Sequence, residues 1–431
     1  MLRISVKRLA AITVSIFVSA WAYAQTDGTY VGYSPYSVYG VGNMHQGGTA
    51  WSRGMGGVGI ATRNKRFINT ANPASLTARD SLSFMSDFTV SSRLSLFNEG
   101  DKTGFNTTFN LENFVISFPM WKNSAFIAGL SPFSDVGYSI TDYQVDYYTN
   151  YRTFYTKGNG GLYQVYIGAA YTLWNRLSLG VQGSYIFGHI NKKAVTDNSD
   201  SSFMDFATGD SLQVNNFSLK AGLQYEQPVS NNSYVTLGAT YRMSTPFGGH
   251  RIHYLQNGSY SRTREEKLIK EDNMFLGDEI GAGLSFRKSD VWSAEVNYTR
   301  SDWSNSGFSA VPGFSNTGES VTFTSGIGQS VRAGFEITPN RNDIRYFFKR
   351  CTYRAGAYYD SSYYLVNGSH VDAIGVTFGM TLPVFRWYNG LSVGVDLGRR
   401  GLAGNQVKET YAGFSLGMNM FDIWFKKPRY E

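Results

Sequence analysis

The first residues that could carry chemistry are glycines near the N-terminus, in the stretch GMGGVG at positions 54–59. Their spacing matches the fingerprint with which dinucleotide-binding folds hold a pyrophosphate, and Asp80 follows at the distance of a ribose ligand. That fingerprint needs a preceding strand and an enclosing βαβ unit, and the sequence predicts neither. We therefore expect no cofactor. Gly57 and Gly59 instead predict a segment that passes close to a neighbouring wall.

The second candidates are histidines. His189, His250 and His253 fall in predicted surface loops, where a surface hydrolase would place acid–base residues. No His–Asp spacing singles out a site, so we expect no catalytic residue and no metal ligand set. Cys351 is the only cysteine, which excludes an intrachain disulfide.

The N-terminus predicts export. Basic Arg3, Lys7 and Arg8 precede an apolar run, and Ala22-Tyr23-Ala24 forms a small-x-small cleavage site, which predicts a signal peptide over 1–24. Arg3, Lys7 and Arg8 supply three of the seven excess positive charges of the chain, so the remaining net charge gives little support to nucleic-acid binding. Aromatic residues make up 16% of the chain and there are 47 glycines, a composition typical of a transmembrane β-barrel.

Alternating polarity recurs along the chain from Leu82 onward. In 163–173, for example, every second residue from Tyr163 to Leu173 is apolar, and the same period returns in 374–382. Such runs predict fourteen strands, an even number as single-chain bacterial barrels require. The predicted strands start near Leu82, Thr103, Ala125, Leu162, Leu177, Leu212, Tyr234, Glu279, Val291, Val321, Cys351, Val371, Leu391 and Lys408.

The connections distinguish a barrel from a soluble sandwich, which would show the same alternation. Short turns alternate with long loops, predicted at 132–161, 189–211, 245–278 and 301–320, as periplasmic turns and outer loops do. Five tryptophans lie at the short turns or the C-terminal end and predict one interfacial girdle. They are Trp121, Trp174, Trp292, Trp387 and Trp424. We predict an all-β transmembrane antiparallel barrel over 81–431.

The segment 25–80 is left over, and we interpret it as a plug inside the lumen. It contains Asn72-Pro73-Ala74 shortly before the first strand, which could also be an ordinary Asn-Pro turn. With Gly57, Gly59 and a fourteen-stranded barrel beside it, this turn resembles the hatch of the FadL family of outer-membrane transporters. Parts of the C-terminal region, such as Tyr353-Arg354-Ala355-Gly356, also resemble an uncharacterised branch of that family.

The resemblance implies a route through the wall. In the FadL family a kink in the third strand opens a lateral exit, and here Gly129, Pro132 and Gly137 interrupt the third predicted strand. An equal alternative is that Pro132 ends this strand at the rim. We expect the turn at Asn72, Pro73 and Ala74 to meet the bend.

Aromatic residues crowd the outer loop that follows. They could form a groove that captures an apolar ligand, or they could pack on one another over the mouth. The residues predicted to capture ligand are Tyr138, Tyr147, Tyr148, Tyr151, Phe154 and Tyr155.

Charged residues of inward parity predict mutual ion pairs or plug contacts, since barrel interiors are polar. They are Asp87, Arg93, Lys220, Arg242, Glu295, Arg332, Glu336 and Asp396. A basic turn with Arg341, Arg345, Lys349 and Arg350 around Phe347 and Phe348 predicts contact with headgroups, or else a partner.

The resulting hypothesis is a barrel in the outer membrane of a Gram-negative cell, surrounded by outer-membrane lipids, with both termini periplasmic. It takes up hydrophobic, fatty-acid-like molecules by passive diffusion and is no enzyme. The alternative, which the resemblance also implies, is a protein-interaction or shuttle component of type IX secretion that binds secretion-system proteins.

Overall fold

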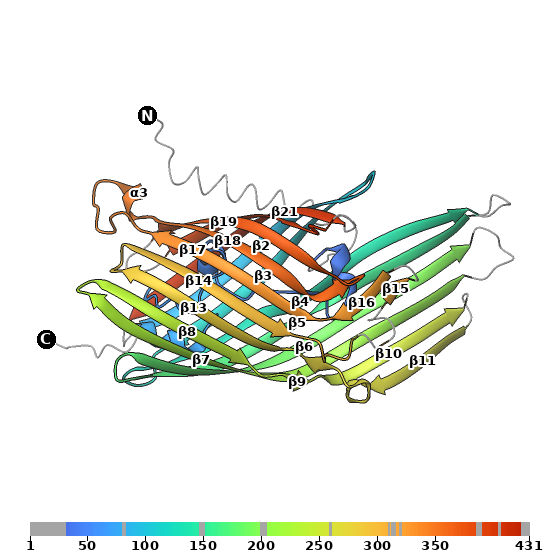
Figure 1. The fold of residues 1–431 in the computed structure, drawn as a ribbon, viewed down its shortest axis with the longest axis horizontal. Coiled ribbons are helices and arrows are strands. Elements are labelled where there is room, and N and C mark those ends of the chain that lie inside the picture. The colour runs from blue at the N-terminus through green and yellow to red at the C-terminus, as the bar shows by residue number, and fades with distance from the viewer. Residues whose placement is uncertain are drawn as a thin grey trace.

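The protein is described by a computed structural model over residues 32–79, 83–145, 151–198, 205–257, 261–308, 311, 316–318, 321–384, 390–403 and 407–423. In these residues fourteen long strands form one antiparallel sheet, which closes where the first strand pairs with the last from Ser83↔Ile423 to Asn98↔Lys408 (Figure 1). The strands are β2 (Ser83–Glu99), β3 (Lys102–Phe118), β4 (Ser124–Val145), β5 (Tyr151–Leu173), β6 (Leu177–Asn198), β7 (Phe206–Ser230), β8 (Ser233–Arg242), β13 (Asp278–Lys288), β14 (Trp292–Asp302), β17 (Ile327–Ile337), β18 (Thr352–Val366), β19 (Ser369–Pro383), β20 (Gly390–Arg400) and β21 (Lys408–Ile423).

The strands form where the two-residue period predicts them, and the apolar parity faces outward. On β5, Val165, Ile167 and Tyr171 are exposed, whereas Tyr166, Gly168 and Ala170 between them turn inward and are buried. Lipid would cover the exposed apolar side chains, while the backbone hydrogen bonds are satisfied between strands in a closed wall. The predicted fourteen-stranded barrel is therefore confirmed.

The two ends of the barrel differ. At one end the strands are joined by short turns, such as those after Leu173 and Ser230. At the other end β4 to β7 extend as long hairpins (Figure 1). The loops predicted at 132–161 and 189–211 are mostly strand in the described residues, so that part of the prediction is wrong. In the outer parts of β6 and β7 the apolar side chains alternate in the opposite phase, so the outward apolar pattern of the lower wall does not continue there.

The polarity of the wall reverses near the long-hairpin end. Ile186 and Ile190 on β6, and Leu212 and Val214 on β7, point inward and are buried, whereas Gln213 is exposed. Together with Trp303 and other side chains they form an apolar core inside the barrel. This end therefore has a buried apolar interior, as a soluble β-sandwich has. The rest of the barrel is apolar outside and mainly polar inside, apart from two smaller apolar clusters, one around Ile68 and Leu76 and one around Trp51 and Met55.

Residues between β8 and β13, and between β14 and β17, build smaller elements at the long-hairpin end. Of these, β10 pairs with the outer part of β7 and with β11. The smaller elements are β9 (Thr245–Pro246), β10 (Gly248–Asn257), β11 (Ser261–Leu268), η3 (Ile269–Asp272), β12 (Phe275–Leu276), β15 (Asn316–Gly318) and β16 (Val321–Ser325).

The N-terminal segment, residues 32–79, lies against the inner faces of the wall. Its elements are η1 (Pro35–Val38), β1 (Asn43–Met44), α2 (Ala50–Arg53) and η2 (Pro73–Ala78). Tyr36 and Val38 join the apolar core, whereas η2 lies beside the short-turn halves of β6 and β7. The segment therefore begins in the long-hairpin half and runs toward the short turns, where β2 starts. The predicted leader, and both chain ends predicted to be periplasmic, fall outside the described residues.

The part of the chain that the structure describes contains no helix long and apolar enough to span a membrane.

Candidate functional site

The turn at Asn72 fastens the N-terminal segment to the wall. Asn72 is fully buried, and its Oδ1 accepts a hydrogen bond from the N–H of Ala74 at 3.0 Å, which caps η2. Its Nδ2 donates to the carbonyl oxygens of Ile60 (2.7 Å), Leu223 (3.2 Å) and Ala239 (3.3 Å). One side chain therefore joins the turn to β7 and β8.

Glycines allow the close approach that the sequence predicts. Gly57 has φ +76° and closes a turn in which its N–H donates to the carbonyl of Ser52 at 2.7 Å. A Cβ on Gly59 would lie 2.8 Å from Asn69 Oδ1. On the wall side, a Cβ on Gly180 or Gly356 would overlap the backbone of the segment. Larger residues at these positions would push segment and wall apart.

Two buried carboxylates of the wall hold the middle of the segment. Glu295 on β14 accepts hydrogen bonds from the N–H groups of Gly59 (3.0 Å) and Ala61 (2.8 Å), and from the hydroxyl of Thr62. Glu336 on β17 accepts from Trp51 Nε1 at 2.6 Å and Arg354 Nε at 2.7 Å. These contacts follow the prediction that inward charges bind each other or the plug.

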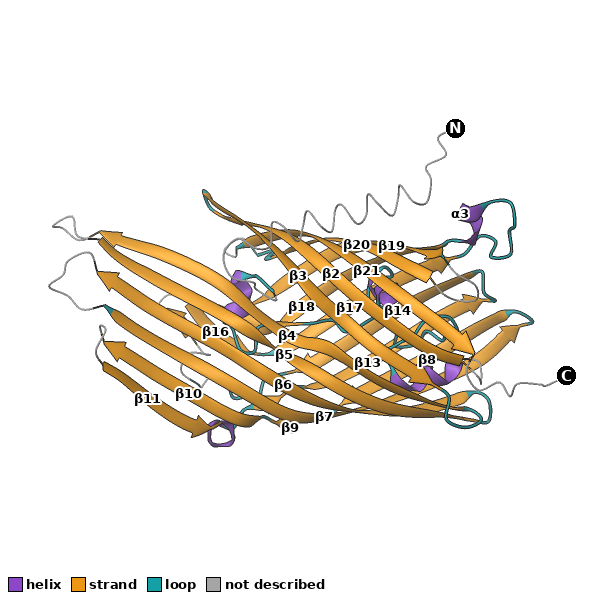
Figure 2. Ribbon diagram, turned by 180° about the vertical axis from the view of Figure 1, so that it is seen from behind, coloured by secondary structure: helices purple, strands orange, loops and turns teal. Residues whose placement is uncertain are grey.

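The wall is interrupted between β3 and β4. The two strands pair from Phe118↔Phe126 to Phe114↔Leu130, and no further pair is found in the described residues. Beyond this point they diverge (Figure 2), and the β4–β5 register shifts between Pro132 and Ser134. Pro132 lacks an N–H and breaks the ladder as expected. However, β4 continues to Val145, so Pro132 does not end the strand at the rim.

The N-terminal segment occupies the β4 side of this interruption. β1 pairs with β4 through Asn43↔Asp135 and Met44↔Ser134, and His45 N–H donates to the carbonyl of Phe133 at 2.9 Å. Gly129 lies in the last paired stretch, and the carbonyl of Gly137 accepts from Ser34 N–H at 2.8 Å. β1 and His45, rather than the Asn72 turn, therefore lie at the bend of β4.

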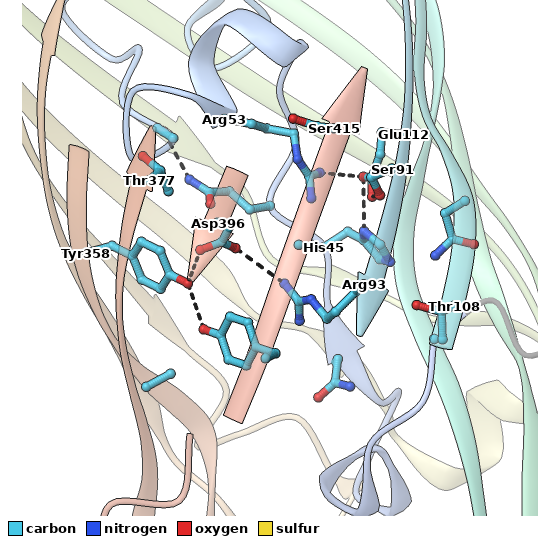
Figure 3. A pocket seen from close by; sticks show the side chains of 18 of the residues that line it. His45, Arg53, Ser91, Arg93, Thr108, Glu112, Tyr358, Thr377, Asp396 and Ser415 are labelled. Carbon is cyan, nitrogen blue, oxygen red and sulfur yellow. Dashed lines mark hydrogen bonds and ion pairs between the residues drawn. The ribbon is translucent and has the colours of Figure 1, made fainter. Parts of the chain in front are cut away.

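His45 joins the two separated strands, and Figure 3 shows its contact with Glu112 of β3. Its Nε2 lies 2.6 Å from Asp135 Oδ2 on β4, and its Nδ1 lies 3.5 Å from Glu112 Oε2 on β3. Arg53 NH1 approaches the same Glu112 oxygen at 2.6 Å. Burial lowers the pKa of His45, but the carboxylates of Asp135 and Glu112 outweigh it and raise the pKa to about 9. The imidazolium thus bridges β3 and β4 at neutral pH.

A polar cavity of about 160 Å³ lies beside this bridge. Its wall includes Asp396, which lies 3.8 Å from Arg93 and accepts a 2.7 Å hydrogen bond from the Tyr358 hydroxyl (Figure 3). A second cavity of about 340 Å³ fills the lumen. Its charged lining comprises His45, Lys220, Arg242, Arg332 and Arg400 against Glu279 and Asp360. With His45 protonated, cations outnumber carboxylates in the lining of this cavity, and two of them, His45 and Arg400, also pair with Asp135 and Glu409 outside it.

The structure describes the side chains of three of the predicted capture residues. Tyr138 is buried in the apolar core, with its ring against Gly158. Phe154 and Tyr155 lie on β5 in the β4–β5 hairpin. Tyr147 and Tyr148 fall outside the described residues, as does the side chain of Tyr151.

Sequence reasoning missed His45, Glu112 and Asp135, which carry no motif. Their only signal was that Glu112 falls within a predicted strand and His45 in a segment without periodicity. In the described residues no group of three or more His, Cys, Asp or Glu side chains could hold a metal ion.

Comparisons with solved structures identify the fold. The toluene transporter TodX of Pseudomonas putida has 14% identity and a TM-score of 0.55, with 88% of this chain and 98% of that chain covered. The toluene transporter TbuX of Ralstonia pickettii has 13% identity and a TM-score of 0.52, with coverages of 87% and 98%. A Pseudomonas aeruginosa FadL homologue has 11% identity and a TM-score of 0.51, with coverages of 88% and 99%.

No curated protein matches the sequence. A family model, BamG, matches residues 5–431, nearly the whole chain. The protein therefore belongs to the BamG family and has the fold of the FadL-type outer-membrane barrels.

Proposed function

We propose that this barrel takes up fatty-acid-like molecules across the outer membrane by passive diffusion. Residues 32–79 act as its plug, and the ligand leaves sideways between β3 and β4. The observation that carries the proposal is the end of β3–β4 pairing at Phe114↔Leu130, beside a polar cavity. An amphiphile suits such an opening, because its head can occupy the polar lumen while its tail remains in lipid.

The charged lining of the larger cavity favours a ligand with an acidic head group. The larger cavity has more cationic than acidic groups in its lining, and Lys220 and Arg242 share the single carboxylate of Glu279 at 3.8 and 3.3 Å. A carboxylate ligand would add the charge that this triad lacks. The smaller cavity is lined mainly by polar groups, which disfavours an unsubstituted hydrocarbon there.

The route starts at the β4–β5 hairpin, passes the lumen and requires the plug to move. The turn at Asn72, Pro73 and Ala74, with Gly57 and Gly59, is the gate and moves with the plug. His45 then leaves Glu112 and Asp135, so that β3 is no longer joined to β4. Gly129, Pro132 and Gly137 give β4 the bend that separates it from β3. Tyr138 packs in the apolar core at the long-hairpin end and closes that end of the barrel. Phe154 and Tyr155 contact the ligand at the β4–β5 hairpin.

A disulfide between plug and wall tests this route. The hydroxyls of Thr77 and Ser178 lie 3.1 Å apart, so a T77C/S178C variant can cross-link η2 to β6. In cells that lack other fatty-acid channels, oxidation should reduce uptake of radiolabelled oleate to background, and reduction should restore it. A T338C/T352C variant is the control, because those hydroxyls lie 2.8 Å apart between the end of β17 and the start of β18 and neither belongs to the plug. Unchanged oleate uptake by the oxidised plug variant would reject the route.

The second candidate is the protein-interaction role, in type IX secretion or elsewhere. The observation that favours it is the apolar core, in which Tyr36 and Trp303 fill the long-hairpin end of the barrel. A barrel whose lumen is closed by this core would serve as a scaffold that binds other proteins. Native mass spectrometry of the purified barrel distinguishes the two: bound fatty acid supports transport, whereas a stoichiometric protein partner with no oleate uptake supports the scaffold.

A further inference from the structure

A loop at the short-turn end is built differently from the other turns. The α3 loop, residues 338–351, contains the short helix α3 (Phe347–Arg350) and connects β17 to β18. Figure 2 shows it standing apart from the barrel rim. It leaves the wall beside Trp292, which pairs with Ile337 and whose ring lies 5.1 Å from that of Phe286 and 6.0 Å from that of Phe335.

This level of the barrel carries other exposed indole rings. Trp121 and Trp174, in two neighbouring short turns, are 72% and 81% exposed. Indole rings favour the boundary between hydrocarbon and headgroups, so this ring of tryptophans marks the membrane interface. The α3 loop therefore begins at the depth of the headgroups.

The tip of the loop is apolar and uncovered. Ile344 is fully exposed, Phe348 is 58% exposed and Tyr346 is 50% exposed. The tip is an ordered turn, because Asp343 Oδ1 accepts hydrogen bonds from the N–H groups of Arg345 (2.9 Å) and Tyr346 (2.7 Å). Three large apolar side chains held out by a formed turn indicate a surface made for an apolar environment.

Basic side chains surround these rings. The loop contains Arg341, Arg345, Lys349 and Arg350, and Asp343 is its only acid. Arg345 lies over the Tyr346 ring at 5.5 Å, and Lys349 Nζ lies over the same ring at 4.7 Å. Arg350 lies over Phe347 at 5.2 Å. Cations and rings thus share one surface, as in segments that lie in a lipid interface.

We propose that the α3 loop is a lipid-binding anchor for acidic phospholipids of the leaflet at the short-turn end. Ile344, Tyr346 and Phe348 enter the interface, and Arg345 and Lys349 contact phosphates from the same face. Continuity with the tryptophan ring favours lipid over a protein partner, since the loop starts at headgroup depth. The loop offers separate side chains rather than a groove, which also suits lipid.

Hydrogen–deuterium exchange of the intact barrel in nanodiscs tests the anchor. Exchange of 338–351 should be slower with phosphatidylglycerol present than with phosphatidylcholine alone, and native mass spectrometry should detect retained phosphatidylglycerol. An R345E/K349E variant should lose both effects. A K122E variant is the control, because Lys122 is an exposed lysine in another turn at the same end. Unchanged exchange in the wall strands verifies folding.

Two results would overturn the proposal. Equal exchange of the loop in both lipids would show that acidic headgroups are not bound, and would leave this surface to a protein partner. Equal loss of bound phosphatidylglycerol in K122E and R345E/K349E would show that any basic residue at this end suffices. Neither result bears on oleate uptake, so the anchor and the transport proposal can fail separately.

Discussion

At the scale of single residues, the separated strands are held by charges rather than by a ladder. His45 faces Asp135 on β4 and Glu112 on β3, while Arg53 of α2 shares Glu112 with it. Ser91 also donates to Glu112. Where backbone pairs are missing, one imidazolium and one guanidinium join β3, β4 and the N-terminal segment.

This bridge should depend on pH in a known direction. The folded pKa of His45, about 9, exceeds the unfolded value of about 6.5. Its contribution to stability is therefore fully present below pH 6.5 and is lost as pH rises through about 9. Limited proteolysis of 32–79 should become faster above pH 9 in the native protein. In H45Q it should be faster already at pH 7 and show no such rise.

At the scale of elements, the N-terminal segment is shaped by close contact with wall strands. Gly56, with φ +73°, lies against β17 and β18, where Ala333 and Ala357 are its neighbours. Gly356 of β18 leaves room for the backbone of Met55 and Gly56. Glycine is therefore needed on both sides of this contact.

Adding one methyl group to the wall should loosen the segment. In G356A the new Cβ would overlap the segment's backbone, and overpacking of this kind costs about 1–3 kcal/mol. We expect faster proteolysis of residues 32–79 with an intact barrel, measured by gel mobility before and after heating. G183A is the matched control, because a Cβ there meets nothing within 4 Å. Equal proteolysis of both variants would contradict this explanation.

At the scale of the whole molecule, two solvent regimes divide the barrel. Toward the short turns, apolar side chains such as Phe217 and Leu219 face outward and polar ones face the lumen. Toward the long hairpins, Leu212 and Val214 face inward and Gln213 faces outward. The membrane must therefore surround the first region, and water the second.

The position of the membrane boundary on β7 follows from this division. Phe217 is 73% exposed, and arginine in its place should destabilise the barrel by roughly 2–4 kcal/mol if it lies near the bilayer midplane. Q213R, on the same face of the same strand, should change stability little. Urea unfolding in lipid vesicles, followed by tryptophan fluorescence, measures both variants. A similar loss in Q213R would place the boundary farther toward the hairpins.

The sequence by itself determined the number of strands, their outward parity and the existence of a glycine-rich segment before them. These features are local. A two-residue period can be read from one strand alone, and a glycine permits backbone conformations that other residues avoid, whatever surrounds it. Most predicted starts therefore fall close to the observed strands, as with Leu177 for β6 and Lys408 for β21, whereas the predicted starts Leu162 and Leu212 lie well inside β5 and β7. The turn at Asn72 was also predicted, because Asn before Pro favours a turn. Only the structure shows that Asn72 caps the short helix η2.

Only the tertiary structure decided where the wall stops pairing, how far the hairpins extend and which residues join there. His45 and Glu112 are far apart in sequence and come together because β1 takes the edge of β4 that β3 leaves. The apolar core at the long-hairpin end likewise depends on strands and the N-terminal segment enclosing one space. A local period indicates which face of a strand a residue occupies. Which space the strands enclose, and which distant residue a side chain contacts, depend on the fold of the whole chain.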